Sequence, residues 1–293
     1  MSLSARFIKK FIGSPKLFSE QTTFENLASK RAAYKKLQRY FPVHKNVKIQ
    51  PVKTKQFKAE WLRQPGTRQD AVLLYFHGGG FVFDSTKIHR RLVADIGKAS
   101  KLDALSVDYS LSPENPFPVA LNECLAAYEW LLKTYPSSQI ALAGDSAGGS
   151  LVLSLLLTLK QKGLPYPACG VAICPATDAA KLSRKPTNDF LKLENVMFFI
   201  DAYFQKTARD HPVASPIYGD WHGLTPLLIH ADTNEVMYPS AKRFVQKTRS
   251  QGVDTTFYVT SGLWHVWHMA TQFVPEARVA VTNIGDYIKA HMS

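Results

Sequence analysis

The sequence predicts an α/β fold in which a mostly parallel, eight-stranded sheet has helices on both faces. Six short apolar runs alternate with helix-length segments from residue 71 onward, which is typical of parallel strands covered on both sides. Two earlier runs, 47–55 and 57–64, have polar residues at every second position, which indicates an antiparallel hairpin at a sheet edge. The length of 293 residues suits one such domain, because a single hydrophobic core stops growing at roughly 250–300 residues.

The apolar runs predict the parallel strands, and the segments between them predict the helices. The strands are AVLLYF (71–76), ALSVDY (104–109), IALAG (140–144), GVAIC (170–174), PLLIH (226–230) and TTFYV (255–259). The helices fall near 85–101, 116–135, 147–163, 240–252 and 276–290. The gap at about 175–225 is too long for one connection and contains a helical stretch at about 191–206, so we expect an insertion above the sheet.

Two helices are predicted before the first strand. The first, at 6–12, is amphipathic, with Phe7, Ile8, Phe11 and Ile12 on one side and Lys9 and Lys10 on another. The second runs from Thr22 as N-cap, with Glu25 three residues on, to Phe41 before a proline. The chain therefore divides into N-terminal helices at 1–45 and an α/β domain at 46–293 that carries the insertion.

The positive charge is concentrated near the N-terminus. Residues 1–58 carry 14 Lys and Arg against Glu20 and Glu25, which leaves 22 basic and 21 acidic residues for 59–293. A basic arm of this kind could attract an anionic membrane surface or an acidic partner. The alternative is a solvated outer face of the N-terminal helices. We expect no nucleic-acid partner.

Cysteine use and the N-terminus both indicate a cytoplasmic protein. Cys124, Cys169 and Cys174 form no paired spacing, and we expect them to be reduced and buried. The first residues lack the apolar stretch and cleavage site of a secretory signal. No apolar stretch approaches the roughly 18 residues of a membrane span.

A serine stands where a buried strand passes into a helix. Ser146 is the centre of GDSAG (144–148), which directly follows the strand IALAG. A serine at such a junction lies on a sharp, strained turn, and the flanking glycines avoid clashes with the neighbouring strand and helix. The motif makes Ser146 a candidate nucleophile.

A run of three glycines follows the first parallel strand. His77 precedes Gly78, Gly79 and Gly80, and such a run lets backbone N–H groups turn toward a ligand. On its own the run could also be a flexible or phosphate-binding loop. Together with the serine motif downstream, it predicts an oxyanion hole.

Candidate acids and bases follow the last two strands. A serine hydroxyl becomes a good nucleophile when a base takes its proton, and the base must be held by an acid. Asp232 and Glu235 follow the run PLLIH, and His265 and His268 follow TTFYV. Elsewhere, His230 is expected in the core or at a sheet end, and His89, His211 and His222 are expected at the surface.

The chain resembles the hormone-sensitive-lipase-like esterases of the α/β-hydrolase fold from about residue 69 to 288. The resemblance rests on HGGGF (77–81), DYSLSPENPFP (108–118), GDSAGG (144–149), and SP (215–216) before TPLLI (225–229). The sequence departs from the family at Ser110, where relatives usually have Arg, at Asn115, where they have His, and at Pro239, where a second acid is common. We therefore expect different lid or dimer contacts.

The resemblance implies a role for each motif residue. It implies Ser146 as nucleophile, His265 as base and Glu235 as acid, with Asp232 as the competing acid. It implies an oxyanion hole from the N–H groups of Gly79, Gly80 and Ala147, and pocket or support roles for His77, Gly78, Phe81 and Asp145. Segments 1–45 and 175–225 would form a cap over the acyl pocket. Five aromatic residues are expected in the pocket or the core: Phe81, Phe83, Phe198, Phe199 and Tyr203.

These residues predict a serine carboxylesterase that cleaves short- to medium-chain acyl esters through an acyl-enzyme, with no metal or cofactor. One alternative is an amidase or peptidase on the same fold. Another is a non-enzymatic ligand-binding relative, against which the presence of His265 argues. The expected partner is a small-molecule ester, and a homodimer and weak contact of residues 1–58 with an anionic membrane are further alternatives.

Overall fold

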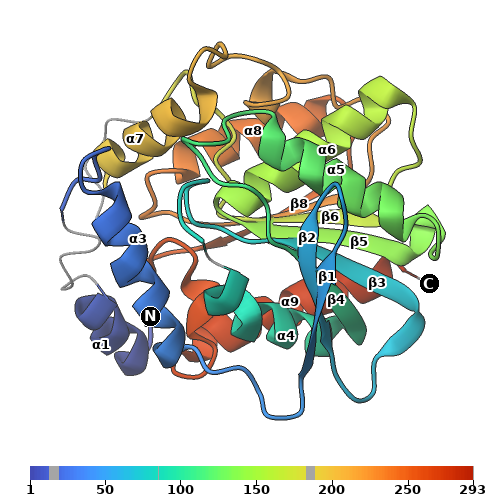
Figure 1. Ribbon diagram of the computed structural model, residues 1–293, viewed down its shortest axis with the longest axis horizontal. Coiled ribbons are helices and arrows are strands. Elements are labelled where there is room, and N and C mark those ends of the chain that lie inside the picture. The colour runs from blue at the N-terminus through green and yellow to red at the C-terminus, as the bar shows by residue number, and fades with distance from the viewer. Residues whose placement is uncertain (13–19, 85, 183–188, 293) are drawn as a thin grey trace.

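A twisted eight-stranded sheet forms the centre of the computed structural model, which describes residues 1–12, 20–84, 86–182 and 189–292 (Figure 1). The strands are β1 (Lys48–Lys53), β2 (Lys58–Arg63), β3 (Arg68–Phe76), β4 (Leu102–Val107), β5 (Ile140–Asp145), β6 (Cys169–Ile173), β7 (Leu227–Asp232) and β8 (Thr255–Thr260). Their order is β1-β2-β4-β3-β5-β6-β7-β8. β2 is antiparallel to both β1 and β4, and the remaining pairs are parallel. The predicted fold class is confirmed.

Helices cover both faces of this sheet. The α-helices are α1 (Leu3–Ile12), α3 (Leu27–Lys35), α4 (Thr86–Ser100), α5 (Val119–Leu131), α6 (Ala147–Lys162), α7 (Leu193–Phe204), α8 (Tyr238–Ser250) and α9 (Pro275–Ala290). Short 3-10 turns occur at η1 (Lys36–Tyr40), η2 (Ser137–Gln139), η3 (Pro216–Tyr218) and η4 (Trp267–Ala270). Helices α4 and α9 lie on one face, and α5, α6 and α8 lie on the other (Figure 1).

The central strand β3 shows why its sequence is apolar throughout. Val72 and Leu74 belong to the core on the side of α5 and α6, whereas Leu73 and Tyr75 belong to the core on the side of α4 and α9. Successive side chains of a strand point to opposite faces, so a strand covered on both sides needs apolar residues at every position. Parallel strands also bring their carboxyl ends to one edge of the sheet.

The N-terminal helices differ from the sequence prediction in their boundaries. Helix α3 begins at Leu27, with Asn26 at the N-cap position, so the N-cap predicted at Thr22 is wrong. Thr22 is buried, and its backbone N–H donates to Asn195 Oδ1 of α7 at 2.7 Å. This tertiary contact replaces the predicted cap. The predicted apolar side of the first helix includes Phe11 and Ile12, whose side chains lie outside the described part of the chain.

Helix α1 is held against the loop that follows β8. The Lys9 ammonium donates to the carbonyl oxygens of Gly262 and Leu263 at 3.0 and 2.8 Å. At the start of the chain, the Ser2 hydroxyl donates to Glu276 of α9 at 2.9 Å. Part of the basic arm is therefore bound to the α/β domain rather than free in solvent.

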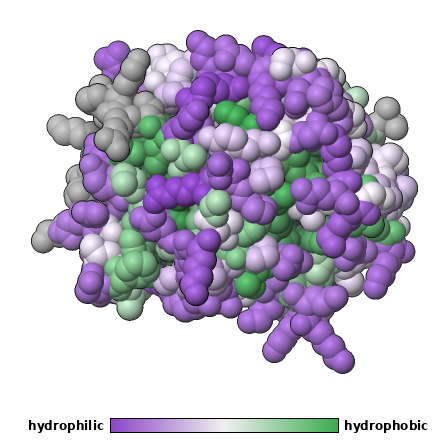
Figure 2. Space-filling view, turned by 90° about the horizontal axis from the view of Figure 1, so that it is seen from above, coloured by the Kyte–Doolittle hydropathy of each residue, from purple (hydrophilic) through white to green (hydrophobic). Residues whose placement is uncertain are grey.

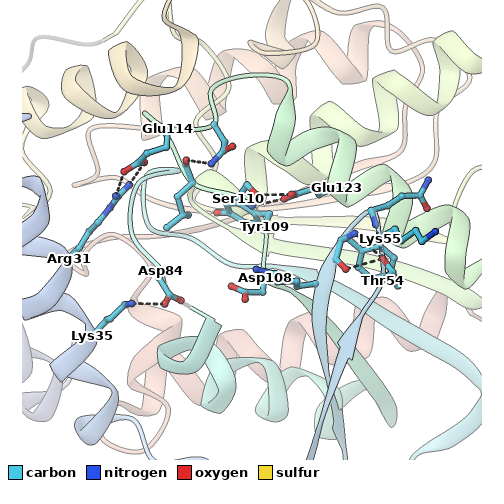
Figure 3. A pocket seen from close by; sticks show the side chains of 15 residues that line it. Arg31, Lys35, Thr54, Lys55, Asp84, Asp108, Tyr109, Ser110, Glu114 and Glu123 are labelled. Atoms are coloured by element: carbon cyan, nitrogen blue, oxygen red, sulfur yellow. Dashed lines mark hydrogen bonds and ion pairs between the residues drawn. The ribbon is translucent and has the colours of Figure 1, made fainter.

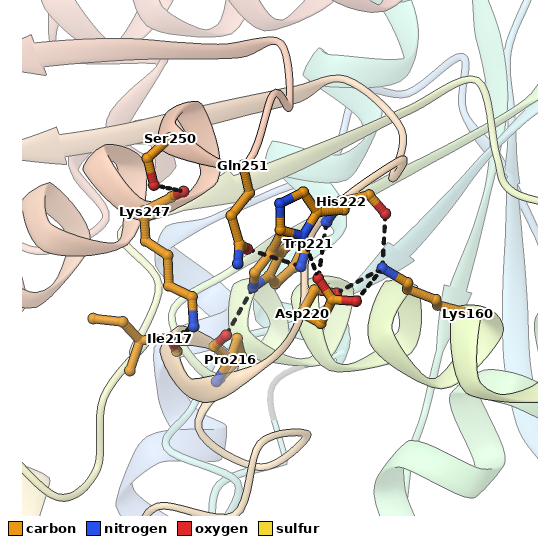
Figure 4. A network of polar contacts seen from close by, with 9 residues as sticks. All are labelled: Lys160, Pro216, Ile217, Asp220, Trp221, His222, Lys247, Ser250 and Gln251. Carbon is orange, nitrogen blue, oxygen red and sulfur yellow. Dashed lines mark hydrogen bonds and ion pairs between the residues drawn. The ribbon is translucent and has the colours of Figure 1, made fainter.

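The carboxyl end of the predicted insertion contacts α6 and the end of α8 (Figure 4). The Trp221 indole donates to the Pro216 carbonyl at 2.9 Å, and the Trp221 backbone N–H donates to Gln251 at 3.0 Å. Lys160 of α6 donates to the Asp220 carboxylate at 2.7 Å. Residues 183–188 of the predicted insertion lie outside the described residues.

Hydrophilic side chains predominate on the face seen in Figure 2, and apolar residues show between them in separate areas. Within the described residues, none of the helices combines the length and the apolar character that crossing a bilayer requires. Cys124, Cys169 and Cys174 are buried and unbridged, as the sequence predicts.

Candidate active site

Ser146 lies at the junction between β5 and α6 in a conformation that few non-glycine residues adopt. Its φ is 53° and its ψ is −119°. Its backbone N–H donates to the Ile173 carbonyl at 2.7 Å, and its carbonyl accepts from the Ser150 N–H at 3.0 Å. Strained backbone of this kind persists where surrounding contacts hold it, often at functional sites. The turn presents the serine hydroxyl at the carboxyl edge of the sheet.

A chain of two hydrogen bonds connects Ser146, His265 and Glu235. Ser146 Oγ lies 2.8 Å from His265 Nε2, and His265 Nδ1 lies 2.7 Å from Glu235 Oε2. Glu235 is 1% exposed and His265 is 7% exposed. The loops after β5, β7 and β8 meet at the same sheet edge, which brings together three residues far apart in sequence.

The structure joins Glu235, and not Asp232, to the imidazole. The Asp232 carboxylate accepts the Thr260 hydroxyl at 2.7 Å and the Leu263 N–H at 3.0 Å, so it braces the loop after β8. The Asp232 backbone N–H in turn donates to Glu235 Oε1 at 2.8 Å.

Of the two candidate histidines, His265 bonds to Ser146 and His268 does not. His268 Nε2 lies 2.9 Å from His230 Nδ1, and both rings are buried away from Ser146's hydrogen-bond chain. Burial lowers the pKa of His230 to about 3 and also lowers the pKa of His268. These two rings therefore stay neutral. His230 lies in the core, which is one of the two places that the sequence predicts for it.

Burial lowers the pKa of the His265 imidazole, but several acids reverse this effect. The Glu235 hydrogen bond and charge raise the pKa, with further contributions from the charges of Asp189 and Asp145. The resulting pKa lies above the ordinary value for histidine. A base that binds its proton more firmly is better suited to accept one from a serine hydroxyl.

Gly79 and Gly80, in the loop after β3, line the same cavity as Ser146. Gly79 and Gly80 have φ values of 112° and 61°, which other residues rarely adopt. Among the described residues, neither N–H donates to another backbone group. The N–H of Ala147 is also free of an intrahelical partner, because it is the first residue of α6.

Asp145 holds this glycine loop in place. Its Oδ1 accepts the Tyr75 hydroxyl at 2.7 Å and the Gly78 N–H at 3.0 Å, and its Oδ2 lies 3.0 Å from His89 Nε2. Burial raises the pKa of Asp145, but the charge and hydrogen bond of His89 outweigh it, so the pKa is lowered. His89 is only 1% exposed, so the predicted surface position is wrong: the ring is the buried partner of Asp145.

His77 and Phe81 each stack on a tyrosine ring, and neither is among the described residues that line the cavity beside Ser146. The His77 ring stacks on Tyr109 at 4.2 Å between ring centroids, and its Nδ1 lies 2.7 Å from the Gly78 carbonyl oxygen. Burial lowers the pKa of His77 to about 4. Phe81 stacks on Tyr203 at 3.7 Å between centroids.

An apolar cavity of about 610 Å³ opens beside Ser146. The N-terminal segment contributes Phe7, Ile8, Thr22, Ala33, Tyr34, Lys36, Leu37, Arg39, Tyr40 and Phe41, and the insertion contributes Phe190, Leu191, Asn195 and Phe199. Among the five aromatic residues expected in the pocket or the core, Phe83 and Phe199 line the cavity. Phe198 packs on Phe24 instead, at 5.0 Å between centroids.

Comparisons with known proteins agree with this architecture. A family model described as the α/β-hydrolase fold matches residues 73–269, which is more than half of the chain. The chain belongs to the α/β-hydrolase fold family.

The relatives of this hydrolase include an acetyl-hydrolase and esterases. It is 35% identical to an acetyl-hydrolase of Streptomyces hygroscopicus, over 79% of each chain. It is 28% identical to an esterase of Acinetobacter venetianus, over 88% of this chain and 87% of the relative. A crystal structure of an esterase from the bacterial hormone-sensitive lipase family matches with a TM-score of 0.93 at 31% identity, over 100% of this chain and 99% of the other. The hydrolase is therefore a hormone-sensitive-lipase-like carboxylic ester hydrolase.

Two site residues of this hydrolase carry no motif in the sequence. The Cys174 thiol donates to Glu235 Oε1 at 3.0 Å, and Asp189 Oδ1 accepts the His265 backbone N–H at 3.1 Å. Burial raises the pKa of the Cys174 thiol, and the Glu235 charge raises it further, so the thiol keeps its proton. Cys174, Glu235 and His265 have potential metal-ligand atoms within 4.8 Å of one another, but a protonated thiol is a poor ligand.

The loop in which the hydrolase lacks the usual Arg is braced from the N-terminal segment (Figure 3). Ser110 donates to Glu123 through its backbone N–H at 2.5 Å and its hydroxyl at 2.7 Å. Arg31 of α3 donates to the Ser112 carbonyl at 2.6 Å and to the Glu114 carboxylate at 2.6 and 2.9 Å. A cavity of about 480 Å³, lined mostly by charged and polar residues, lies between these groups.

Proposed function

We propose that this carboxylic ester hydrolase uses Ser146, His265 and Glu235 as its catalytic triad. The observation that carries the proposal is the hydrogen-bond chain from Ser146 Oγ through the imidazole to Glu235 Oε2, at 2.8 and 2.7 Å. The order of nucleophile, acid and base along the chain is that of α/β-hydrolases.

The proposed first half-reaction transfers the acyl group to the enzyme. Ser146 Oγ bonds to the ester carbonyl carbon while His265 Nε2 takes the hydroxyl proton, and Glu235 stabilises the imidazolium. The tetrahedral intermediate then collapses, the carbon–oxygen bond to the alcohol breaks, and the alcohol leaves with the proton from His265. The product of this step is an ester of Ser146.

The second half-reaction hydrolyses that ester. A water molecule attacks the acyl carbon as His265 takes its proton. The bond between the acyl carbon and Ser146 Oγ then breaks, Ser146 Oγ takes that proton from His265, and the carboxylic acid leaves the free enzyme. In both halves the oxyanion would accept hydrogen bonds from the N–H groups of Gly79, Gly80 and Ala147. One such donor is worth about 3 kcal/mol in another serine hydrolase.

We further propose that residues 1–45 and 175–225 form a cap over the acyl pocket. Both segments supply walls of the 610 Å³ cavity beside Ser146, and most of those walls are apolar. A short to medium acyl chain would fill such a space by hydrophobic contact. The homodimer stays a prediction.

Two experiments test the proposed function. Ser146→Ala should lower kcat for a p-nitrophenyl ester at least about 10⁴-fold while leaving the melting temperature near that of the wild type. An organophosphate should label the wild type alone. Activity of the Ala variant above about one hundredth of wild type would show that another residue is the nucleophile.

Substrate series separate the remaining alternatives. A series of p-nitrophenyl esters of increasing acyl length should show highest kcat/KM for short and medium chains. A matched anilide should react much more slowly than the ester of the same acyl group, and a faster anilide reaction would favour the amidase alternative.

A further inference from the structure

A buried carboxylate of the insertion lies against the loop that carries His265. Asp189 is 2% exposed, and its Oδ1 accepts the His265 backbone N–H at 3.1 Å. Its Oδ2 is buried and has no hydrogen-bond partner within the described part of the chain. A buried carboxylate oxygen without a partner is costly, so its retention calls for a physical reason.

Charged groups near Asp189 supply that reason. Burial raises the pKa of Asp189 to about 6, and the charge of His265 acts in the opposite direction. The Glu235 carboxylate also faces Asp189, and the Cys174 thiol lies within electrostatic range of both acids. Asp145 and the neutral ring of His268 also lie within electrostatic range of His265. The imidazole is therefore the group that gains most from a second negative charge at this place.

The residues that follow Asp189 line the 610 Å³ cavity beside Ser146. Phe190 and Leu191 line it, and they follow Asp189 directly in sequence. One short stretch of the insertion thus touches both the cavity and the backbone of His265. Asp178, another buried carboxylate of the insertion, instead bonds to Arg243 at 2.7 Å and to the Tyr218 hydroxyl at 3.1 Å.

We propose that Asp189 is a positioning residue for His265, fixing the histidine loop through its hydrogen bond and stabilising the imidazolium through its charge. The proposal rests on the proposed function, in which His265 is the catalytic base. It assigns to the insertion a direct part in the chemistry, in addition to its part in enclosing the acyl chain.

Asp189→Asn and Asp189→Ala separate the two contributions. The Asn side chain keeps an oxygen that can accept the His265 N–H but carries no charge, and the Ala side chain provides neither. We expect kcat to fall about 10-fold for Asn and further for Ala, with KM for a short ester within about twofold of wild type. Asp178→Asn serves as the matched control for loss of a buried charge in the insertion.

The pH dependence gives the sharper test. His265 must be neutral to accept a proton, and the Asp189 charge raises its pKa. Without that charge, the acid limb of kcat/KM should move to lower pH by about half a unit or more in Asp189→Asn. NMR titration of the His265 ring in the full-length chain should show the same direction. The proposal would be overturned if Asp189→Asn left both the acid limb of kcat/KM and the His265 titration unchanged. It would also be overturned if Asp178→Asn lowered kcat as much as Asp189→Asn does.

The proposed function can fail independently of this inference. His265→Ala with near wild-type activity would remove the proposed function itself, whatever Asp189 does. If His265→Ala is inactive and Asp189→Asn matches the wild type in kcat and in its acid limb, then the triad stands and the role of Asp189 is refuted.

Discussion

The carboxyl edge of the sheet and the two segments above it hold their functional residues by different means. At the sheet edge, unusual backbone conformations contribute to the positioning: Ser146 lies on the strained turn after β5, and Gly79 and Gly80 have positive φ values. The Asp145 carboxylate holds the start of the glycine loop through the Gly78 N–H. In segments 1–45 and 175–225, single polar side chains such as Arg31 and Asp189 make the connections. Changes at the edge should therefore affect the rate of reaction, and most changes above it should affect substrate selection.

The largest effect should separate the two acids that follow β7. Glu235→Gln removes the charge that stabilises the His265 imidazolium and should lower kcat about 10³-fold or more. Asp232→Asn, which alters only loop-bracing hydrogen bonds, should lower kcat less than about 10-fold. Steady-state kinetics with one ester measures both. A reversed ranking would transfer the triad acid to Asp232.

A smaller effect, on stability, should come from the contact between α6 and the sheet edge. A Cβ at Gly148 would overlap the backbone carbonyl groups of Phe76 and His77, which cannot move aside as a side chain can. Gly148→Ala should lower the free energy of unfolding by about 3 kcal/mol or more. Gly163→Ala, where a Cβ meets open space but φ is 64°, should cost about 1 kcal/mol. Denaturant unfolding compares them, and equal costs would mean that α6 can move away from β3.

Removing the link between α3 and the 108–118 loop should mainly affect the segments above the sheet. Arg31→Ala deletes hydrogen bonds to Ser112 and Glu114, and should lower the free energy of unfolding by about 2 kcal/mol. It should also raise KM for longer acyl esters while leaving kcat for acetate esters close to wild type. Lys45→Ala, an exposed site of equal charge, is the control. A large loss of kcat on short esters would show that the two regions are not separable.

The smallest effect concerns the basic arm. Residues 1–58 carry 14 basic residues against two acidic ones, and Leu3 and Phe7 of α1 are 83% and 71% exposed. Binding to anionic vesicles should be measurable by cosedimentation at low salt and should fade above roughly 0.1 M, where the Debye length is about 10 Å. Neutral vesicles are the control. Equal binding to both kinds, or none to either, would leave the arm as a solvated face.

The sequence by itself determined the sheet, the place of Ser146 between a strand and a helix, and the glycine loop. These features are local: the apolar runs specify strands covered on both sides, and GDSAG and HGGG each lie within a single strand-to-loop junction. The family resemblance added a preference for Glu235 over Asp232. The residues alone did not distinguish between the two acids after β7 or between the two histidines after β8, because no local sequence feature shows which side chain reaches Ser146.

The tertiary structure decided what depends on contacts between distant residues. His89 meets Asp145 across 56 positions, Asp189 meets His265 across 76, and Arg31 meets Ser112 across 81. No periodicity or motif predicts such pairs, because each depends on how helices and loops pack over the sheet. The same reason explains the wrong N-cap: Thr22 looks like a helix start in sequence, but its N–H is bound by Asn195 of a helix that only folding brings near.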